Sequence, residues 1–268
     1  MQNDNLTLNP YPSNPKVVVF GGSGFLGSHV ADVLTEANYE VKIFDIKKSP
    51  YLKEKQQMIV GDILDFEQVL DAICGCDYVY HFAGIANLDD VTTKPKESVR
   101  LNVEGTVNIL EACRLHKIKR LIYASTIYVY SNKGGFYRCS KQSAEIYIEE
   151  FYCRYNLNYT ILRYGTLYGT RANEKNSIYK YLIQALDHKK ITISGDGEEL
   201  REYIHVRDAA ELTAKILSPE FENKHLIITG HHPIKLKQLV TIIKEILNNN
   251  IEIIYKPGTN PSHYTITP

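Results

Sequence analysis

The sequence of 268 residues lacks a net charge and lacks any apolar run of membrane-spanning length. Its 31 basic and 31 acidic residues balance, so no overall charge marks it for nucleic acid or for an anionic membrane surface. The longest apolar runs, such as Val17–Phe20, have the length of a single β-strand and fall far short of a bilayer span. We therefore expect neither a nucleic acid nor a membrane among the partners of this protein.

Cysteine patterns typical of disulfide frameworks or zinc sites are also missing. The five cysteines are Cys74, Cys76, Cys113, Cys139 and Cys153. This odd number contains no Cys-x-x-Cys pair and no cysteine–histidine spacing suited to zinc. The sequence therefore predicts no disulfide framework and no metal centre.

Residues 1–15 are rich in Asn and Pro, and they have neither the basic start nor the apolar core of a signal peptide. We expect a flexible leader there and a cytoplasmic protein. At the other end, residues 255–268 show little regular pattern, so we expect the C-terminal lobe to be shortened.

Short β-branched runs alternate with longer segments of helical periodicity, which is typical of a parallel sheet covered on both faces. The predicted strands are Lys16–Phe20, Glu40–Phe44, Met58–Val60, Tyr78–His81, Arg120–Ala124 and Tyr159–Leu162. The predicted helices between them are Leu26–Glu36, Phe66–Ile73, Glu97–His116 and Ser140–Tyr155. After Arg163 the rhythm changes. We expect helices near Tyr179–Leu186, Asp208–Leu217 and Leu236–Leu247, and short strands near Ile191–Ile193, Leu226–Ile228 and Glu252–Tyr255. We expect an α/β fold, with a Rossmann-type doubly wound parallel sheet over residues 16–165, to which some later segments return, and a small C-terminal α/β lobe over residues 166–268.

The first predicted strand runs directly into a turn that contains Gly21, Gly24 and Gly27, and then into an amphipathic helix. Glycines there permit a tight turn and let the backbone approach a pyrophosphate at the helix N-terminus. Asp45 ends the second predicted strand eighteen residues after Gly27, close to the spacing of about 20 for an acid that bonds a ribose 2′-hydroxyl. Because a carboxylate would repel the 2′-phosphate of NADP, we expect NAD as the cofactor.

Tyr137 and Lys141 are four residues apart near the start of a predicted helix, so their side chains share one face. A nearby ammonium favours the phenolate, so we expect a lowered pKa for Tyr137 and a role as general base. Thr126 ends the fifth predicted strand, where its hydroxyl can donate a hydrogen bond to a substrate oxygen. Ser125 is the competing candidate, because strand alternation points the two side chains to opposite faces.

Together these motifs resemble the extended short-chain dehydrogenase/reductase superfamily, in particular its NAD-dependent epimerase/dehydratase family. Further matching segments are Gly61–Ile63, His81–Gly84, Asn102–Ala112, Leu162–Gly169 and Gly195–Asp208. The resemblance implies that Thr126, Tyr137 and Lys141 are the catalytic residues. It implies cofactor contacts from Gly21, Gly24, Phe25, Leu26, Gly27, Asp45, Asp62, Ile63, Phe82, Ala83, Gly84, Asn102, Tyr137, Lys141 and Tyr164. It implies substrate contacts from Thr126 at the end of the fifth strand and from Thr166 and Arg201 in a C-terminal substrate-binding lobe, with Arg201 on the diphosphate of a nucleotide sugar.

The sequence also departs from the family pattern. Thr166 replaces the family's substrate asparagine, and the loop Ser131–Phe136 before Tyr137 is unusually short. The Asp-Glu pair that follows the catalytic threonine in 4,6-dehydratases of the family is Ile127-Tyr128 here. Without this acid and base we expect no dehydration of a sugar ring.

The leading functional hypothesis is an NAD-dependent nucleotide-sugar epimerase that acts at C4 through a transient keto-sugar. One alternative is a nucleotide-sugar or keto-sugar reductase that uses NAD(P)H from solution. Another alternative, of a different class, is a catalytically silent dinucleotide-binding sensor or scaffold. The resemblance further implies a homodimer that pairs through the predicted helices Glu97–His116 and Ser140–Tyr155.

Overall fold

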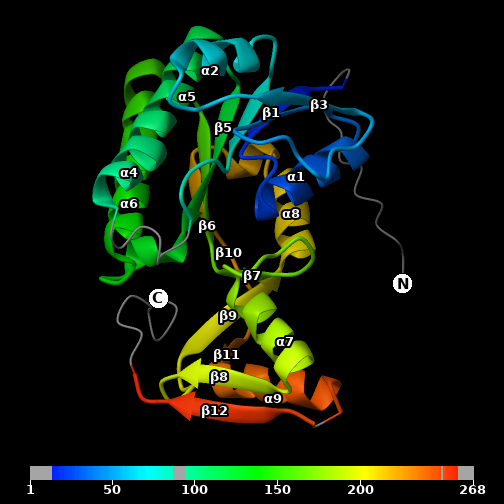
Figure 1. Cartoon of the computed structure of the whole chain (residues 1–268). Coiled ribbons are helices and arrows are strands. Elements are labelled where there is room, and N and C mark those ends of the chain that lie inside the picture. Colours follow the sequence, from blue (N-terminus) through cyan, green and yellow to red (C-terminus); the bar gives the residue numbers. More distant parts are fainter. Residues whose placement is uncertain (1–13, 87–93, 249, 259–268) are drawn as a thin grey trace.

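A computed structural model describes residues 14–86, 94–248 and 250–258. Its centre is a sheet of seven strands whose neighbouring pairs are all parallel (Figure 1). The strand order is β10 (Lys224–Ile228), β6 (Tyr159–Tyr164), β5 (Arg120–Thr126), β4 (Tyr78–His81), β1 (Lys16–Phe20), β2 (Glu40–Asp45) and β3 (Gln56–Val60). The winding direction reverses between β1 and β4, as in doubly wound sheets. The predicted Rossmann-type fold class is confirmed.

Helices cover both faces of this sheet (Figure 1). One face carries α2 (Phe66–Ile73), α5 (Gly105–Leu115) and α6 (Gly135–Tyr155), and the other carries α1 (Phe25–Glu36) and α8 (Val206–Lys215). The alternation of β1 explains why both faces need cover: Val18 and Phe20 pack toward α5, whereas Val17 and Val19 pack toward α1. Among the described residues, no helix is both long enough and apolar enough to cross a bilayer.

Two helical segments differ from the prediction. The stretch predicted as one helix over Glu97–His116 consists of α4 (Pro95–Val99), a π-helical turn (Arg100–Glu104) and α5. Such π turns often occur at functional sites, because the extra residue redirects side chains. Helix α6 begins at Gly135, five residues before the predicted start at Ser140, so Tyr137 lies in its first turn.

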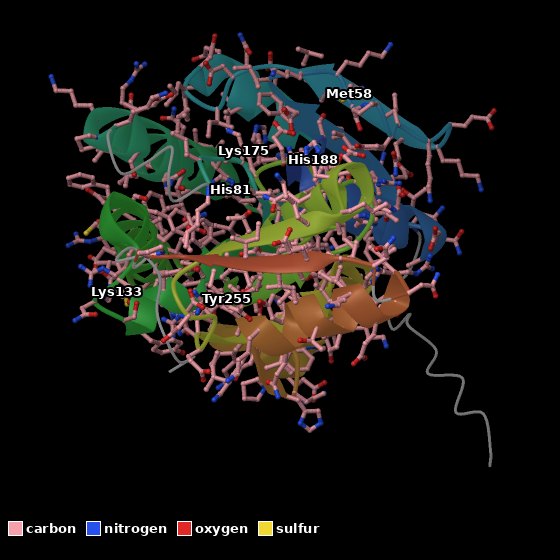
Figure 2. All side chains as sticks on the ribbon, turned by 60° about the horizontal axis from the view of Figure 1, so that its bottom comes forward. Met58, His81, Lys133, Lys175, His188 and Tyr255 are labelled. Atoms are coloured by element: carbon pink, nitrogen blue, oxygen red, sulfur yellow. The ribbon has the colours of Figure 1, made fainter. Side chains whose placement is uncertain are left out.

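The remaining elements form a smaller lobe beyond the carboxyl ends of the main strands (Figure 1). It contains a three-stranded sheet of β11 (Pro233–Lys235), β9 (Leu200–His205) and β7 (Thr166–Tyr168), a two-stranded sheet of β12 (Glu252–Lys256) and β8 (Lys190–Ser194), and the helices α7 (Ser177–His188) and α9 (Leu236–Ile246). Figure 2 views the molecule from this lobe, with β12, where Tyr255 is labelled, beside α9. The sequence prediction missed β7, β9 and β11, because these strands are mostly half-buried and show no alternation of apolar and polar residues. The predicted boundary between the lobes at residue 165 stays a prediction.

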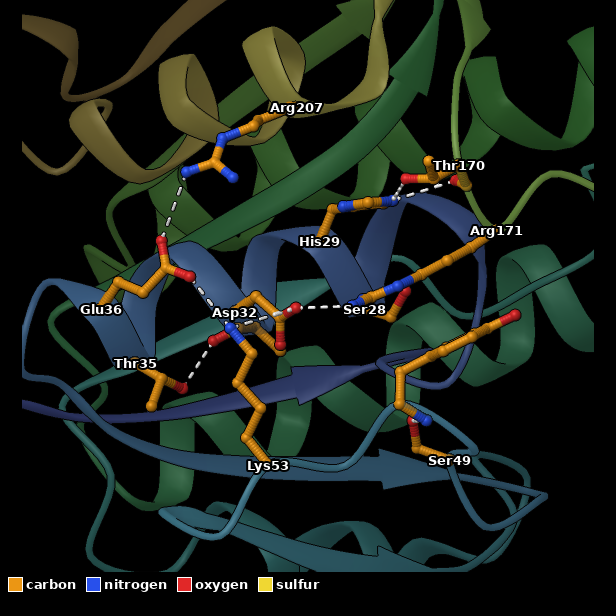
Figure 3. A network of polar contacts seen from close by, with 12 residues as sticks. Ser28, His29, Asp32, Thr35, Glu36, Ser49, Lys53, Thr170, Arg171 and Arg207 are labelled. Carbon is orange, nitrogen blue, oxygen red and sulfur yellow. Dashed lines mark hydrogen bonds and ion pairs between the residues drawn. The ribbon is translucent and has the colours of Figure 1, made fainter.

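A buried carboxylate on α1 connects the two lobes (Figure 3). Asp32 is 8% exposed and accepts a hydrogen bond of 2.7 Å from Arg171, which follows β7. It also accepts a bond of 3.1 Å from Gln56 and lies 3.4 Å from the Lys53 ammonium. The Arg171 guanidinium stacks 4.4 Å from the centre of the Tyr51 ring. The segment that leads into the smaller lobe is therefore held against α1 and the β2–β3 connection.

Candidate active site

The glycine-rich turn joins β1 to α1 beside the point where the sheet reverses its winding. Gly21 has a φ of +77°, and a Cβ there would lie 2.6 Å from the backbone nitrogen of Ala83, which follows β4. A Cβ at Gly27 would lie 2.3 Å from the Gly21 carbonyl oxygen. Gly24 is the N-cap of α1 and has no side chain with which to bond the first backbone amides of the helix. Phe25, Leu26 and Gly27 therefore begin the helix with no side-chain cap in front of them. This geometry suits the close approach of a pyrophosphate.

Asp45 lies next to this turn at the carboxyl end of β2. One carboxylate oxygen accepts the Ser23 amide at 3.0 Å, and the other accepts the Lys47 amide at 3.2 Å. Asp62 and Ile63 follow β3 at the same edge, where Ile63 is buried and the Asp62 carboxylate accepts the Leu64 amide. The structure thus brings the predicted cofactor residues that follow β1, β2, β3 and β4 together along the carboxyl edge.

Asn102, in the π-helical turn, connects the loop after β4 to α6. Its amide nitrogen donates to Ser140 Oγ at 2.9 Å and to the Ile85 carbonyl at 3.1 Å. Its amide oxygen accepts the Ile85 amide at 2.8 Å, and a Cβ at Gly84 would lie 2.3 Å from that oxygen. Both ends of the Asn102 side chain are therefore engaged by protein groups, and they position the segment Phe82–Gly84 beside α6.

Tyr137 and Thr126 meet at the carboxyl edge of β5. The Tyr137 side chain is buried, and its hydroxyl interacts with the nearby Thr126 side chain. The Tyr128 ring approaches it edge-on, with 6.4 Å between the ring centres. Burial raises the pKa of Tyr137 to about 12, although the interaction with Thr126 lowers it. The expected lowering of the Tyr137 pKa is therefore wrong for this structure, because the cost of burying a phenolate outweighs the favourable contacts.

Lys141 lies one turn further along α6 and is also buried. Its ammonium donates to the Ala124 carbonyl at 2.7 Å and lies 4.6 Å from the centre of the Tyr123 ring. Burial lowers the pKa of Lys141 to about 8, and the negative charge of Glu145 opposes this effect. The ammonium is thus held against the end of β5, just before Thr126.

Ser125 points away from Tyr137, as the alternation of the strand predicts. Its hydroxyl donates to the Glu145 carboxylate, which also receives the Arg163 guanidinium. The sequence analysis missed Glu145 and Arg163. The spacing of four residues between Lys141 and Glu145 was an available signal, because it places both on one helix face.

The predicted site residues still to be placed are Tyr164, Thr166 and Arg201. Tyr164 packs into the core against α1 and α8, and its hydroxyl bonds Thr213 at 2.6 Å, so its side chain has a packing role. Thr166 on β7 pairs with Tyr203 on β9, two residues from Arg201. Residues paired across parallel strands share a face, and so do residues two apart, which places Thr166 and Arg201 on one face of the small sheet.

The family model described as NAD-dependent epimerase/dehydratase matches residues 17–228, which covers most of the chain. The chain belongs to this family. The family resemblance expected from the motifs is thereby confirmed. The site geometry agrees with NAD binding, because the turn that would hold the pyrophosphate has no room for a Cβ at Gly21 or Gly27 and has a carboxylate beside it. The cofactor is NAD.

Two epimerases and one decarboxylase illustrate the range of relatives. A putative UDP-glucose 4-epimerase of Methanocaldococcus jannaschii is 29% identical over 93% of this chain and 88% of that protein. A UDP-N-acetyl-alpha-D-glucosaminuronate decarboxylase of Bacillus cytotoxicus is 27% identical over 90% of this chain and 83% of that protein. The crystal structure of the Thermotoga maritima UDP-glucose 4-epimerase with UDP-glucose has a TM-score of 0.85 at 28% identity, covering 92% of this chain and 87% of that chain. Relatives at this level of identity therefore include enzymes with different reactions on nucleotide sugars, namely epimerases and a decarboxylase.

Proposed function

We propose that the protein is an NAD-dependent nucleotide-sugar epimerase that inverts C4 through a transient keto-sugar. The observation that carries this proposal is the burial of Tyr137 and Lys141 one turn apart on α6, with the Lys141 ammonium bound at the carboxyl end of β5, where Thr126 lies. Tyr137, the proposed proton acceptor, lies at the carboxyl edge of the same sheet as the turn suited to NAD. Epimerases are also prominent among the relatives.

NAD would supply the hydride chemistry of this mechanism, and the turn of Gly21, Gly24 and Gly27 with Asp45 beside it would hold the cofactor. The protein moves the matching proton: Tyr137 takes it from the C4 hydroxyl and later returns it, while Thr126 bonds the same sugar oxygen. Because burial holds the pKa of Tyr137 near 12, loss of its proton requires a nearby positive charge. Lys141, on the same helix face, is the cation that the chain supplies. The remaining contribution of the protein is geometry, which aligns the reacting groups.

The small lobe supplies the substrate site of this proposal. Thr166 and Arg201 share one face of the three-stranded sheet, beyond the edge where Tyr137 lies. A guanidinium fork matches the geometry of a diphosphate, so Arg201 holds the nucleotide and Thr166 contacts the sugar.

Dehydration of the sugar ring is not part of the proposal. The residue after Thr126 is Ile127, whose side chain is buried in the core, and the next is Tyr128, whose ring lies against Tyr137. These positions offer no carboxylic acid and carboxylate to carry protons to and from neighbouring ring carbons.

The test starts with the purified protein and its absorbance spectrum, followed by analysis of the nucleotide released on denaturation. We expect retained NAD and interconversion of UDP-glucose or UDP-N-acetylglucosamine with the C4 epimer. Tyr137→Phe should keep NAD and lose about 100-fold or more in turnover. Tyr147→Phe, on the exposed side of the same helix, is the matched control and should keep full activity. A protein that is empty and oxidises added NADH with a keto-sugar is a reductase, and that result would overturn the proposal.

We also propose a homodimer that forms through the helices on the α6 face. Large apolar side chains at least half exposed on α4, α5 and α6 are Val99, Leu115 and Ile146. Burying such a surface against a second copy removes apolar area from water. Sedimentation velocity should show a dimer, and Ile146→Glu should shift the protein to monomer. A wild-type monomer at micromolar concentration would refute this arrangement. The cytoplasmic location stays a prediction.

A further inference from the structure

Glu145 is a buried carboxylate that the proposed chemistry does not use directly. It lies one turn after Lys141 on α6 and is 6% exposed. A buried charge is costly unless several partners satisfy it, so its contacts indicate what it holds in place.

Glu145 and Lys141 both form hydrogen bonds with the last residues of β5. Lys141 donates to the Ala124 carbonyl at 2.7 Å, and Glu145 accepts the hydroxyl of Ser125. These are consecutive residues, and the next one is Thr126. With the strand held at both positions, strand alternation leaves the side chain of Thr126 on the opposite face from Ser125, the face on which Tyr137 lies nearby.

Arg163 on β6 completes the contacts of Glu145. Its Nε donates at 3.1 Å to one carboxylate oxygen, and one Nη donates at 2.6 Å to the other. The second Nη donates at 2.5 Å to the Tyr130 hydroxyl, and the guanidinium lies 4.6 Å from the centre of the Tyr130 ring. Tyr130 ends the 3₁₀ turn that follows β5 and precedes the short loop into Tyr137. The same ion pair therefore also fixes the approach to the catalytic helix.

The charges around Lys141 make this carboxylate electrostatically important. Glu145 interacts with two cations, the buried Lys141 and the partly buried Arg163. The other titratable groups near Lys141 are His81 from β4, Tyr123 from β5 and Tyr137 from α6. Burial lowers the pKa of His81 to about 3 and raises the pKa values of both tyrosines, so all three are neutral at pH 7.

We propose that Glu145 is a positioning residue of the epimerase reaction: it holds the end of β5 behind Thr126 and is the counter-ion that Lys141 shares with Arg163. This inference rests on the proposed function. Glu145 acts through other residues, because its oxygens are engaged by Ser125 and Arg163.

The test is the pH dependence of kcat for two variants that change opposite charges. In Glu145→Gln, Lys141 and Arg163 lose their shared counter-ion, so Lys141 deprotonates more readily. The alkaline limb of kcat should move down by about one pH unit, and kcat should fall roughly tenfold or more. In Arg163→Met, Glu145 faces Lys141 without a competing cation, so the alkaline limb should move up. The opposite signs distinguish the proposal from a loss of packing, which would move neither limb.

The matched control is Glu149→Gln, one turn further along α6, where a half-exposed carboxylate contacts His225. This variant should leave kcat unchanged, and the alkaline limb of its pH dependence should not move. If Glu145→Gln does not fold, an upward shift in Arg163→Met still supports the proposal, and an unmoved limb there overturns it. If the wild type is active but the alkaline limb of kcat moves in neither variant, the role of Glu145 is refuted and the proposed function is not. A wild type that neither retains NAD nor epimerises nucleotide sugars refutes the proposed function instead.

Discussion

Arg171→Ala is expected to destabilise the protein by about 2–4 kcal/mol. Arg171 donates to the buried Asp32 at 2.7 Å, and a hydrogen bond between charged groups contributes about 1.5–3 kcal/mol. Stacking over the Tyr51 ring at 4.4 Å adds about 0.5–1 kcal/mol. Asp32 keeps Gln56 at 3.1 Å and Lys53 at 3.4 Å, so the loss stays below that of a fully unpaired buried charge.

The matched control is Arg207→Ala in the same network (Figure 3). Arg207 contacts Glu36 at 3.6 Å, and the two side chains are 62% and 52% exposed. Solvent screens such a pair, so its loss should leave the stability of the protein almost unchanged. Thermal unfolding with saturating NAD in every sample should give a Tm lower by about 5–15 °C for Arg171→Ala, and by no more than a few degrees for Arg207→Ala. Equal shifts in the two variants would refute the account of a buried tie between the lobes.

Three further predictions concern the cofactor site and the core. Gly27→Ala places a Cβ 2.3 Å from the Gly21 carbonyl oxygen, so the NAD affinity measured by calorimetry should fall at least about tenfold; unchanged affinity would contradict the tight-turn model. Asp45→Ala should weaken NAD and reduce its preference over NADP in the same assay, and an unaltered preference would exclude Asp45 as the selective group. Burial lowers the pKa of His81 to about 3 from an ordinary value of 6.5, so the unfolded chain binds one more proton between these values. The stability present above pH 6.5 should therefore fall on acidification, by about 2 kcal/mol at pH 5, and urea titrations of His81→Gln should show a flatter pH dependence.

Local patterns in the sequence predicted the elements nearest the site. The strand before Gly21, the strand that ends at Asp45 and the spacing between Tyr137 and Lys141 each depend on a few consecutive residues. Backbone conformation and helical periodicity act over that range, so these features were predicted and then found in the structure. The strands β7 and β9 escaped prediction, because their side chains are partly exposed on both faces.

The tertiary structure decided how the predicted residues act together. The contact between Arg171 and Asp32 joins residues 139 positions apart, and no periodicity relates such positions. The ion pair of Glu145 with Arg163 forms because β5 and β6 are neighbours under α6. The same packing buries Tyr137 and Lys141, which reverses the expected direction of the Tyr137 pKa. The sequence by itself therefore determined the fold class and the glycine turn, and it predicted Thr126, Tyr137 and Lys141 as the catalytic residues. Burial and long-range charge, which exist only once the sheet and helices have assembled, decided the protonation and orientation of these residues.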